Sequence, residues 1–248
     1  MRLEGKTALV TGGSAGIGFA AARAFAMEGA SVYITGRRQQ ELDDAATALG
    51  PRVTAVRADA ASVEDLDRLY AQIASERGHL DVLYANAGFY EFARLGEINE
   101  AHYDRHFDTN VKGLLFTVQK ALPLMRRGAS VILTGSIVAS RGVPAFSVYS
   151  ATKAAVRAFA RGWAVDLKER GIRVNVISPG PIDTPGLEGL AGSPQAVDPL
   201  KRELAATVPL GRMGLPEEIA RAAVFLASDE ASFVTGAELA VDGGAGQV

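Results

Sequence analysis

A tyrosine and a lysine four residues apart are the side chains in this sequence best suited to acid–base chemistry. They stand in the run Tyr149-Ser150-Ala151-Thr152-Lys153, at the start of a predicted helix. Positions i and i+4 of a helix share a face, so the two side chains lie about one turn apart. A free tyrosine titrates near about 10, and a neighbouring ammonium ion lowers that pKa. Taken alone, the pair is more simply explained as an exposed helix face.

A serine thirteen residues before this tyrosine could act on the same substrate atom. Ser136 follows the predicted strand Ser130–Thr134. Its hydroxyl could hydrogen-bond a carbonyl or alcohol oxygen, while Tyr149 gives that oxygen a proton in reduction or removes one in oxidation. As an isolated residue, Ser136 would more simply be a turn residue at the end of a strand. Its meaning therefore depends on the tyrosine and lysine that follow.

A glycine-rich turn follows the first predicted strand and opens a helix. It reads Thr11-Gly12-Gly13-Ser14-Ala15-Gly16-Ile17-Gly18. Glycines let backbone amides approach a pyrophosphate, and the helix N-terminus adds partial positive charge there. The spacing Gly12-x-x-x-Gly16-x-Gly18 differs from the common G-x-G-x-x-G fingerprint of dinucleotide sites. A tight turn that needs glycine and binds nothing is the simpler alternative.

Short apolar runs alternate with longer helical patterns along the whole chain. We expect strands at Thr7–Thr11, Ser31–Thr35, Arg52–Ala58, Val82–Ala85, Ser130–Thr134, Arg173–Ser178 and Glu238–Val241. Helices are expected at Ile17–Glu28, Gln39–Leu49, Val63–Ser75, about Ala101–Met125, Tyr149–Lys168 and Pro216–Leu226. Most strands are nearly continuous hydrophobic runs, as in parallel strands covered on both faces. The alternation predicts one α/β doubly wound domain over residues 1–248, with a mainly parallel seven-stranded sheet.

The segment at about 183–208 breaks this rhythm. It contains Pro, Gly and Ser among short apolar pieces. Long irregular insertions in such domains are usually functional, and many act as lids. We therefore expect an irregular loop that covers the substrate.

Composition excludes several classes of function. The 248 residues are 48% hydrophobic and carry a net charge of −2, with basic residues scattered among acids, so no basic stripe for nucleic acid is present. The absence of cysteine excludes disulfides and thiolate chemistry. No apolar run approaches the roughly 18 residues of a membrane span, and the N-terminus shows no signal-peptide pattern. We expect a cytoplasmic protein with neither a nucleic-acid nor a membrane partner.

Taken together and in order, the motifs resemble the short-chain dehydrogenase/reductase family. The marks are the turn at 11–18, Asn86-Ala87-Gly88, Asn110, Ser136, the Tyr149–Lys153 pair, Pro179-Gly180-Pro181-Ile182-Asp183-Thr184 and Val241-Asp242-Gly243-Gly244. They span essentially the whole chain. The resemblance implies a Rossmann-like fold and hydride transfer between a nicotinamide dinucleotide and a carbonyl or secondary alcohol. A non-enzymatic dinucleotide-binding redox sensor on the same fold is the alternative, since fold does not imply function.

The resemblance also assigns roles to individual residues. Asn110, Ser136, Tyr149 and Lys153 would be catalytic. Lys153 would hold the nicotinamide ribose, and Asn110 would disturb its helix and anchor a water that links Lys153 to solvent. No metal is implied.

Further residues are expected to contact the cofactor. By resemblance Asp59 binds the adenine amino group, Asn86 to Gly88 line the ribose and brace the sheet, Thr184 reaches a phosphate and the Ile182 backbone binds the carboxamide. The complete expected set is Gly12, Ser14, Gly16, Ile17, Gly18, Arg37, Arg38, Asp59, Asn86, Ala87, Gly88, Tyr149, Lys153, Pro179, Gly180, Ile182 and Thr184.

The end of the second predicted strand bears on the choice between NADP(H) and NAD(H). Relatives specific for NAD usually carry an acidic residue there, which binds the ribose hydroxyls and repels a 2′-phosphate. Here Gly36 takes that position, and Arg37 and Arg38 follow. A guanidinium suits bidentate phosphate contact, although both arginines could be ordinary loop residues. Ala15 stands where many NADP-preferring relatives have a basic residue. We predict NADP(H), with reduction as the physiological direction.

Apolar side chains suggest a substrate wall and an assembly. The expected wall is Phe89, Ile137, Val138, Val143, Phe146, Leu187 and Leu190, which favours a hydrophobic ketone or secondary alcohol. The helices at 101–125 and 149–168 carry more apolar residues than one buried face needs, among them Leu114, Leu115, Phe116, Val156, Phe159 and Trp163. By resemblance these helices pair across a two-fold axis, and we predict a homotetramer, with a dimer as the second choice.

Two further groups have simpler expected roles. His79, His102 and His106 lack metal-ligand spacing and acidic partners, so we expect solvated or helix-face residues. Arg126 and Arg127 are expected at a helix C-terminus, where they complement its dipole.

Overall fold

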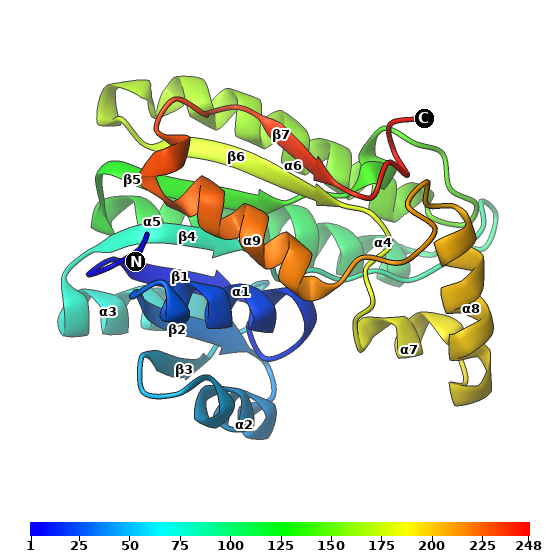
Figure 1. The fold of residues 1–248 in the computed structure, drawn as a ribbon, viewed down its shortest axis with the longest axis horizontal. Coiled ribbons are helices and arrows are strands. Elements are labelled where there is room, and N and C mark those ends of the chain that lie inside the picture. The colour runs from blue at the N-terminus through cyan, green and yellow to red at the C-terminus, as the bar shows by residue number, and fades with distance from the viewer.

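The computed structural model describes residues 1–248, apart from the side chain at position 188. Its centre is a parallel sheet with the strand order β3-β2-β1-β4-β5-β6-β7 (Figure 1). The strands are β1 (Thr7–Thr11), β2 (Ser31–Gly36), β3 (Val53–Arg57), β4 (Leu80–Ala85), β5 (Met125–Thr134), β6 (Arg173–Pro179) and β7 (Glu238–Val241). Every neighbouring pair of strands runs parallel. The predicted seven-stranded doubly wound sheet is confirmed.

Helices cover both faces of the sheet. They are α1 (Gly16–Met27), α2 (Gln39–Leu49), α3 (Val63–Arg77), α4 (Glu100–Phe107), α5 (Leu114–Ala121), α6 (Ser147–Asp166), α7 (Gly186–Ala191), α8 (Pro194–Ala206) and α9 (Pro216–Ala227). One buried cluster joins α1, α2 and α9 to one face, and a second joins α3, α5 and α6 to the other. Along β1, Val10 packs in the first cluster and Leu9 in the second. This alternation explains why a central strand reads as a continuous apolar run.

The start of α3 shows how local sequence fixes a site residue. The Ser62 hydroxyl accepts a hydrogen bond from the Asp65 backbone N–H, which is the expected N-cap. The Asp65 carboxylate in turn accepts from the Asp59 backbone N–H at 2.8 Å. The cap therefore also fixes the backbone of Asp59, one of the predicted cofactor contacts.

The helix expected at about Ala101–Met125 is wrong as a single element. It is divided into α4, a π-helical turn η1 (Asp108–Gly113), α5 and a short 3₁₀ turn at Leu122–Leu124. The disturbance expected around Asn110 is present as η1. β5 then begins at Met125, which pairs with Leu80, and its strand register shifts further along. Arg126 and Arg127 consequently lie in a strand, and the expected helix C-terminus there is also wrong.

The segment expected as an irregular insertion is mostly helical. Residues 186–206, which we call the lid segment, contain α7 and α8 separated by Gly192 at φ +73°. They lie beyond the carboxyl ends of the strands (Figure 1). Pro194 opens α8, and Pro199 lies inside it without ending it. Over the described part of the chain, no helix has the length and apolar character needed to cross a membrane.

Candidate active site

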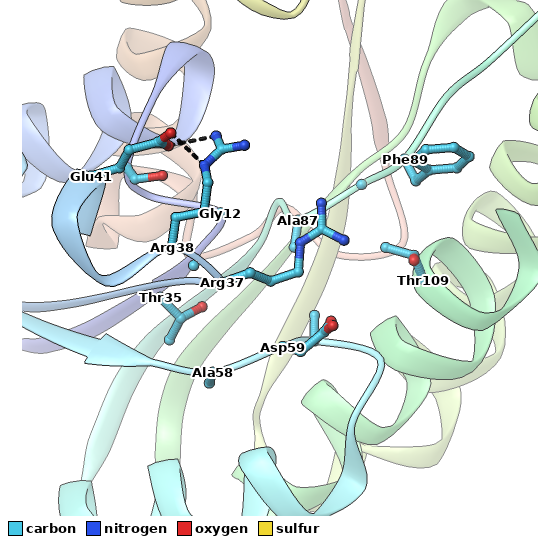
Figure 2. Close-up of a pocket in the computed structure, with 14 residues that line it drawn as sticks. Gly12, Thr35, Arg37, Arg38, Glu41, Ala58, Asp59, Ala87, Phe89 and Thr109 are labelled. Atoms are coloured by element: carbon cyan, nitrogen blue, oxygen red, sulfur yellow. Dashed lines mark hydrogen bonds and ion pairs between the residues drawn. The ribbon is translucent and has the colours of Figure 1, made fainter. Parts of the chain in front are cut away.

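A cleft opens at the carboxyl ends of β1, β2 and β4, where ligands of open α/β sheets bind. Figure 2 shows the residues that line it. Its lining is Gly12, Ser14, Thr35, Gly36, Arg37, Arg38, Glu41, Ala58, Asp59, Ala60, Ala87, Gly88, Phe89 and Thr109. Seven members of the predicted cofactor-contact set thus lie around one cleft.

The glycine-rich turn forms one wall of this cleft. Gly16 begins α1 with φ +54°, a left-handed conformation that glycine adopts without strain. A Cβ on Gly18 would overlap the carbonyl oxygen of Gly12, so only glycine fits there. The turn therefore brings bare backbone, with the N-terminal amides of α1, to the edge of the cleft.

Asn86 ties three strands together behind the turn. Its side-chain amide donates to the Thr11 carbonyl at 3.1 Å and accepts from the Thr134 hydroxyl at 3.2 Å. Its backbone N–H and that of Ala87 both donate to the Thr11 hydroxyl at 3.0 Å. These bonds join the carboxyl ends of β1, β4 and β5 and hold the backbone of Ala87 and Gly88 at the cleft wall.

The two predicted phosphate-binding arginines differ in their surroundings. The Arg38 guanidinium forms an ion pair with Glu41, as the dashed lines of Figure 2 mark. The Arg37 side chain extends from the β2 end into the cleft between Asp59 and Ala87 (Figure 2). A Cβ on Gly36 would meet the Ser14 hydroxyl oxygen and Leu42 at 3.4 Å, an ordinary contact. Arg37 thus stands beside Gly36 and Ser14 with its charge turned into the cleft.

Asp59 lies on the opposite side of the cleft from the turn. One carboxylate oxygen accepts a hydrogen bond from the Ala61 backbone N–H at 3.0 Å, and the side chain is half-buried. Asp59 and Arg37 line the same cleft (Figure 2).

Ser136 and Tyr149 meet beyond the inner end of the cleft. Ser136 follows β5 and caps a 3₁₀ turn at Ile137–Ala139, and its hydroxyl is hydrogen-bonded to the Tyr149 phenol. Tyr149 stands in the first turn of α6, with the Lys153 ammonium 5.5 Å from its ring centre. The three side chains that the spacing singled out therefore share one site.

Lys153 and Asn110 form the buried back of this site. Lys153 is 3% exposed and donates to the Thr134 carbonyl at 2.8 Å. Asn110, 1% exposed, accepts from the Phe89 backbone N–H and donates to the Phe89 carbonyl, both at 2.8 Å. A Cβ on Gly88 would lie 3.5 Å from the Asn110 oxygen and 3.8 Å from Lys153 Nζ, so both polar groups border one narrow space.

The pKa directions at this site differ from the sequence expectation. Burial raises the pKa of Tyr149, any charge on Tyr90 acts in the same direction, and the hydrogen bond with Ser136 opposes both. Burial lowers the pKa of Lys153 to about 8. We expected the lysine to lower the pKa of the tyrosine. Loss of hydration outweighs that effect here, because the Lys153 ammonium is directed at the Thr134 carbonyl.

Two threonines to which the sequence motifs assigned no role take part in the hydrogen bonds of this site. The Thr152 hydroxyl is fully buried, accepts from the Asn110 amide at 3.1 Å and donates to the Tyr149 carbonyl at 2.7 Å. Thr134 supplies the carbonyl that holds Lys153 and the hydroxyl that holds Asn86. The available signals were a threonine inside the Tyr149–Lys153 motif and a threonine at the end of a predicted strand.

The segment after β6 reaches the glycine-rich turn. A Cβ on Gly16 would lie 3.4 Å from the Thr184 side chain, so Thr184 packs beside the N-terminus of α1. Ile182 is fixed by its neighbours, since the Asp183 N–H donates to the Gly214 carbonyl and the Gly214 N–H to the Pro181 carbonyl. Pro179 ends β6, and the Gly180 N–H bonds the Val241 carbonyl. Their predicted contacts with the cofactor remain predictions.

Aromatic rings gather around Tyr149. Phe146 lies 4.6 Å and Tyr90 5.9 Å from the Tyr149 ring, measured between ring centres, and Phe92 packs on Phe146 at 4.7 Å. The Phe89 ring faces His106, and Phe89 also lines the cleft, so its expected place in the substrate wall remains a prediction. Tyr90, which the sequence analysis did not select, contacts Tyr149.

The histidine expectation is wrong in part. His102 and His106 lie on α4, but they are buried. The His106 ring accepts a hydrogen bond from the Glu91 N–H at 3.2 Å and donates from Nδ1 to the His102 carbonyl at 2.7 Å. They thus hold the loop that carries Phe89 and Tyr90. His79 has an acidic neighbour after all, Asp81 at 3.3 Å. Within the described residues, no three His, Cys, Asp or Glu side chains group as metal ligands.

Comparison with known proteins agrees with this geometry. A family model described as Enoyl-(Acyl carrier protein) reductase matches residues 12–246. Oxidoreductase asL5 of Sarocladium schorii is 49% identical over 249 residues, covering 100% of this chain and 98% of the relative. The 3-oxoacyl-[acyl-carrier-protein] reductase FabG of Thermotoga maritima is 36% identical, covering 98% of this chain and 99% of the relative.

A solved structure extends the likeness to three dimensions. A short-chain dehydrogenase/reductase of Brucella melitensis, described as glucose/ribitol dehydrogenase, superimposes with a TM-score of 0.92 at 33% identity, covering 98% of both chains. Such agreement over nearly the whole length leaves one assignment. The chain belongs to the short-chain dehydrogenase/reductase family, whose members are oxidoreductases that use a nicotinamide dinucleotide.

Proposed function

We propose that this protein reduces a hydrophobic ketone with NADPH, with Tyr149 as the proton donor. The observation that carries the proposal is the hydrogen-bonded pair of Ser136 and Tyr149, with Lys153 and Asn110 buried directly behind it. A family member without catalytic activity would need the glycine-rich turn and Asn86. It would have no need of this second, buried set of polar groups.

The chain's own residues would share the work as follows. Ser136 donates a hydrogen bond to the substrate carbonyl oxygen and holds it beside the Tyr149 hydroxyl. Tyr149 gives its phenolic proton to that oxygen, which becomes the hydroxyl of the alcohol product. The bound dinucleotide would supply the hydride that reaches the carbonyl carbon. The oxygen atom is thus held by two hydroxyl groups that the fold fixes before the substrate arrives.

The raised pKa of Tyr149 favours the reductive direction. A phenol with a pKa above its usual value is fully protonated at neutral pH, so it is ready to act as an acid. Acting as a base in alcohol oxidation would require the phenolate, which burial disfavours. The ammonium group of Lys153 would stabilise the phenolate left after proton transfer.

Asn110 supports Lys153 by the position of its side-chain oxygen. Its amide is held by Phe89 and Thr152 within the π-helical turn, so its carbonyl oxygen faces the space near Lys153 Nζ. We propose that a water held there returns a proton to Tyr149 through Lys153. Residues that would hold the dinucleotide itself are the turn at 12–18, Asp59, Asn86 to Gly88 and Thr184.

Arg37 supports the choice of NADPH. Its guanidinium extends into the cleft beside Ser14 and Gly36, and among the described side chains none pairs with it. A 2′-phosphate in that position would gain charge-assisted hydrogen bonds and meet no carboxylate at the end of β2. Arg38 contributes less, because Glu41 already compensates its charge.

The walls of the site support an apolar, ring-bearing ketone. Phe92 and Phe146 form a tilted pair, and Phe146 also packs on the Tyr149 ring. The Ala93 N–H donates to the Ala145 carbonyl at 2.9 Å, which joins the loops of Phe92 and Phe146. Some similar proteins have names that point to other carbonyl compounds, a 3-oxoacyl thioester and sugars. Flat aromatic faces beside the reacting oxygen favour a planar substrate over either.

We propose a homotetramer in the cytoplasm. Phe159 and Trp163 stack at 4.7 Å on α6 and are only half-buried, as are Leu115 and Phe116 on α5. Phe233 is fully exposed near the edge strand β7. These apolar surfaces support burial against further copies of the chain. Light scattering that finds only monomer at micromolar concentration would contradict the assembly.

An assay of cofactor oxidation tests the function. Purified protein is given NADPH or NADH with a panel of aliphatic ketones, aromatic ketones, a sugar and a 3-oxoacyl thioester. We expect oxidation of NADPH, fastest with an aromatic ketone. Binding of NADPH without turnover of any ketone, and of NADP⁺ without turnover of any alcohol, would instead favour a redox sensor.

A further inference from the structure

Tyr90 joins the catalytic tyrosine to the lid segment. Its ring stands edge-on to Tyr149, with an angle of 71° between the ring planes. Its hydroxyl group is hydrogen-bonded to Thr184. It therefore touches two functional regions that come from distant parts of the sequence.

Gly186 at the start of α7 is shaped to receive this hydroxyl. A Cβ on Gly186 would overlap the Tyr90 hydroxyl oxygen and come within 3.2 Å of the ring carbon Cζ. The φ angle of Gly186 lies outside the left-handed range, so the backbone itself would accept any residue. Close approach to Tyr90 is what requires a glycine there. By contrast, a Cβ on Gly189 in the same helix would meet no atom within 4 Å.

The loop that carries Tyr90 is itself held firmly. The Glu91 N–H donates to His106, and the Ala93 N–H donates to the Ala145 carbonyl. The Phe89 backbone is held at both polar groups by Asn110. Tyr90 thus extends from a fixed support toward a short surface helix, α7, that leans on it.

We propose that Tyr90 is a positioning residue that latches the lid segment closed over Tyr149 through its contact with Thr184 and Gly186. The latch sets how readily a ketone enters the pocket and stays there. Because Thr184 also packs beside Gly16, the same contact links the closed lid to the turn that would hold the cofactor phosphates. The inference rests on the proposed function only where substrate kinetics are used.

The central test is a double-mutant cycle of Gly186→Ala and Tyr90→Phe. In the wild-type background, Gly186→Ala pushes the hydroxyl aside and opens the lid, and we expect kcat/KM for the ketone to fall by about tenfold or more. Tyr90→Phe removes the overlapping oxygen, so in that background the same alanine should cost less than about twofold. Equal losses in both backgrounds would overturn the proposal.

Tyr90→Phe alone separates a latch from a catalytic group. Loss of one hydrogen bond should raise the KM of the ketone about three- to tenfold, because the open lid becomes more populated, while kcat changes less than about twofold. Tyr103→Phe, which alters an exposed phenol on α4, is the matched control and should change neither. A large fall in kcat with unchanged KM would contradict the latch.

Limited trypsin digestion measures the opening of the lid segment without any substrate. Arg202 lies exposed in α8. Cleavage after Arg202 should be several-fold faster in Gly186→Ala and in Tyr90→Phe than in wild type, and unchanged in Gly189→Ala. Equal cleavage in all four proteins would refute the latch whatever the assay of ketones shows. Failure of every ketone with cleavage rates as expected would refute the proposed function and leave the latch standing.

Discussion

The end of the cleft that we propose for the adenine, here called the adenine end, and the end that we propose for catalysis, here called the catalytic end, are built in opposite ways. At the adenine end, Arg37 and Arg38 are exposed, and their charges stand in water. At the catalytic end, Asn110 is 1% and Lys153 3% exposed, and each polar atom is held by named partners. The adenine end presents solvated charges that a ligand can reach. The catalytic end keeps its polar groups away from water.

This difference in burial separates the choice of cofactor, at the adenine end, from the reaction itself, at the catalytic end. An exposed arginine can be exchanged at little cost to the fold, because water already solvates it. A buried ammonium loses hydration, which lowers its pKa and costs stability, but interactions in such a site are stronger than in water. We therefore expect substitutions at the catalytic end to abolish turnover. Substitutions at the adenine end should instead change the preference between NADPH and NADH.

Lys153→Met should have the largest effect and should act on activity and stability in opposite directions. We expect turnover to fall by at least about 10²-fold, because the phenolate of Tyr149 loses its cation. At pH 7 the buried ammonium costs about 3 kcal/mol of stability, the difference between a pKa of 10.5 unfolded and about 8 folded. Allowing for the hydrogen bond lost at Thr134, the free energy of unfolding should rise by about 1–3 kcal/mol.

Urea unfolding beside steady-state kinetics checks both halves of this prediction. Lys112→Met, at an exposed lysine on η1, is the control and should change neither quantity appreciably. A variant that lost both stability and turnover would show that the lysine is a structural residue.

The pH dependence sharpens the same contrast. Lys153 loses its proton as pH rises through about 8, so kcat/KM for ketone reduction should fall above pH 8. Stability should move the other way. Between about pH 8 and 10.5 the unfolded chain binds more protons at this lysine than the folded chain does, so this group makes the free energy of unfolding rise with pH. The free energy of unfolding is measured between about pH 8 and 10.5 for the wild type and for Lys153→Met. If the wild type showed no rise with pH relative to the variant, the burial of a charged lysine would be contradicted.

At the adenine end, Arg37→Ala should lower the ratio of kcat/KM with NADPH to that with NADH by about 10- to 100-fold, the value of a charge-assisted contact. Gly36→Asp should lower it further, since a side chain fits there and its carboxylate repels a phosphate. The kcat at saturating cofactor should stay within about threefold of wild type in both. An unchanged ratio in Arg37→Ala would refute the phosphate contact.

Arg38→Ala should have the smallest effect. Its guanidinium is already paired with Glu41, so we expect the cofactor ratio to change less than about threefold. If Arg38→Ala altered the ratio as much as Arg37→Ala, the assignment of the phosphate contact to Arg37 alone would be wrong.

The sequence predicted the structure correctly where a feature is determined by residues within one short segment. The bounds of β1 and β7 were predicted from apolar runs alone, and the proximity of Ser136, Tyr149 and Lys153 from their order and spacing. It failed at β5, because Met125-Arg126-Arg127 continues a helical pattern while pairing with β4 decides the structure. It failed again in the lid segment, where Pro199 and the glycines read as a loop but sit within or beside helices.

Residues that act through distant partners were the hardest to foresee. Tyr90 gains its position only from α6 and from the segment after β6, and His106 only from the loop that it supports. The pKa directions of Tyr149 and Lys153 depend on burial that the spacing of two residues does not report. Such features need the packed structure.

The most direct test of the account is Tyr149→Phe, measured for turnover and for NADPH binding in the same preparation. The ring stays and only the acidic oxygen leaves, so we expect turnover to fall by about 10²–10⁴-fold. The Kd of NADPH, followed by the fluorescence of the reduced nicotinamide, should stay within about threefold of wild type. Near-normal ketone turnover in this variant would contradict the assignment of Tyr149 as the proton donor.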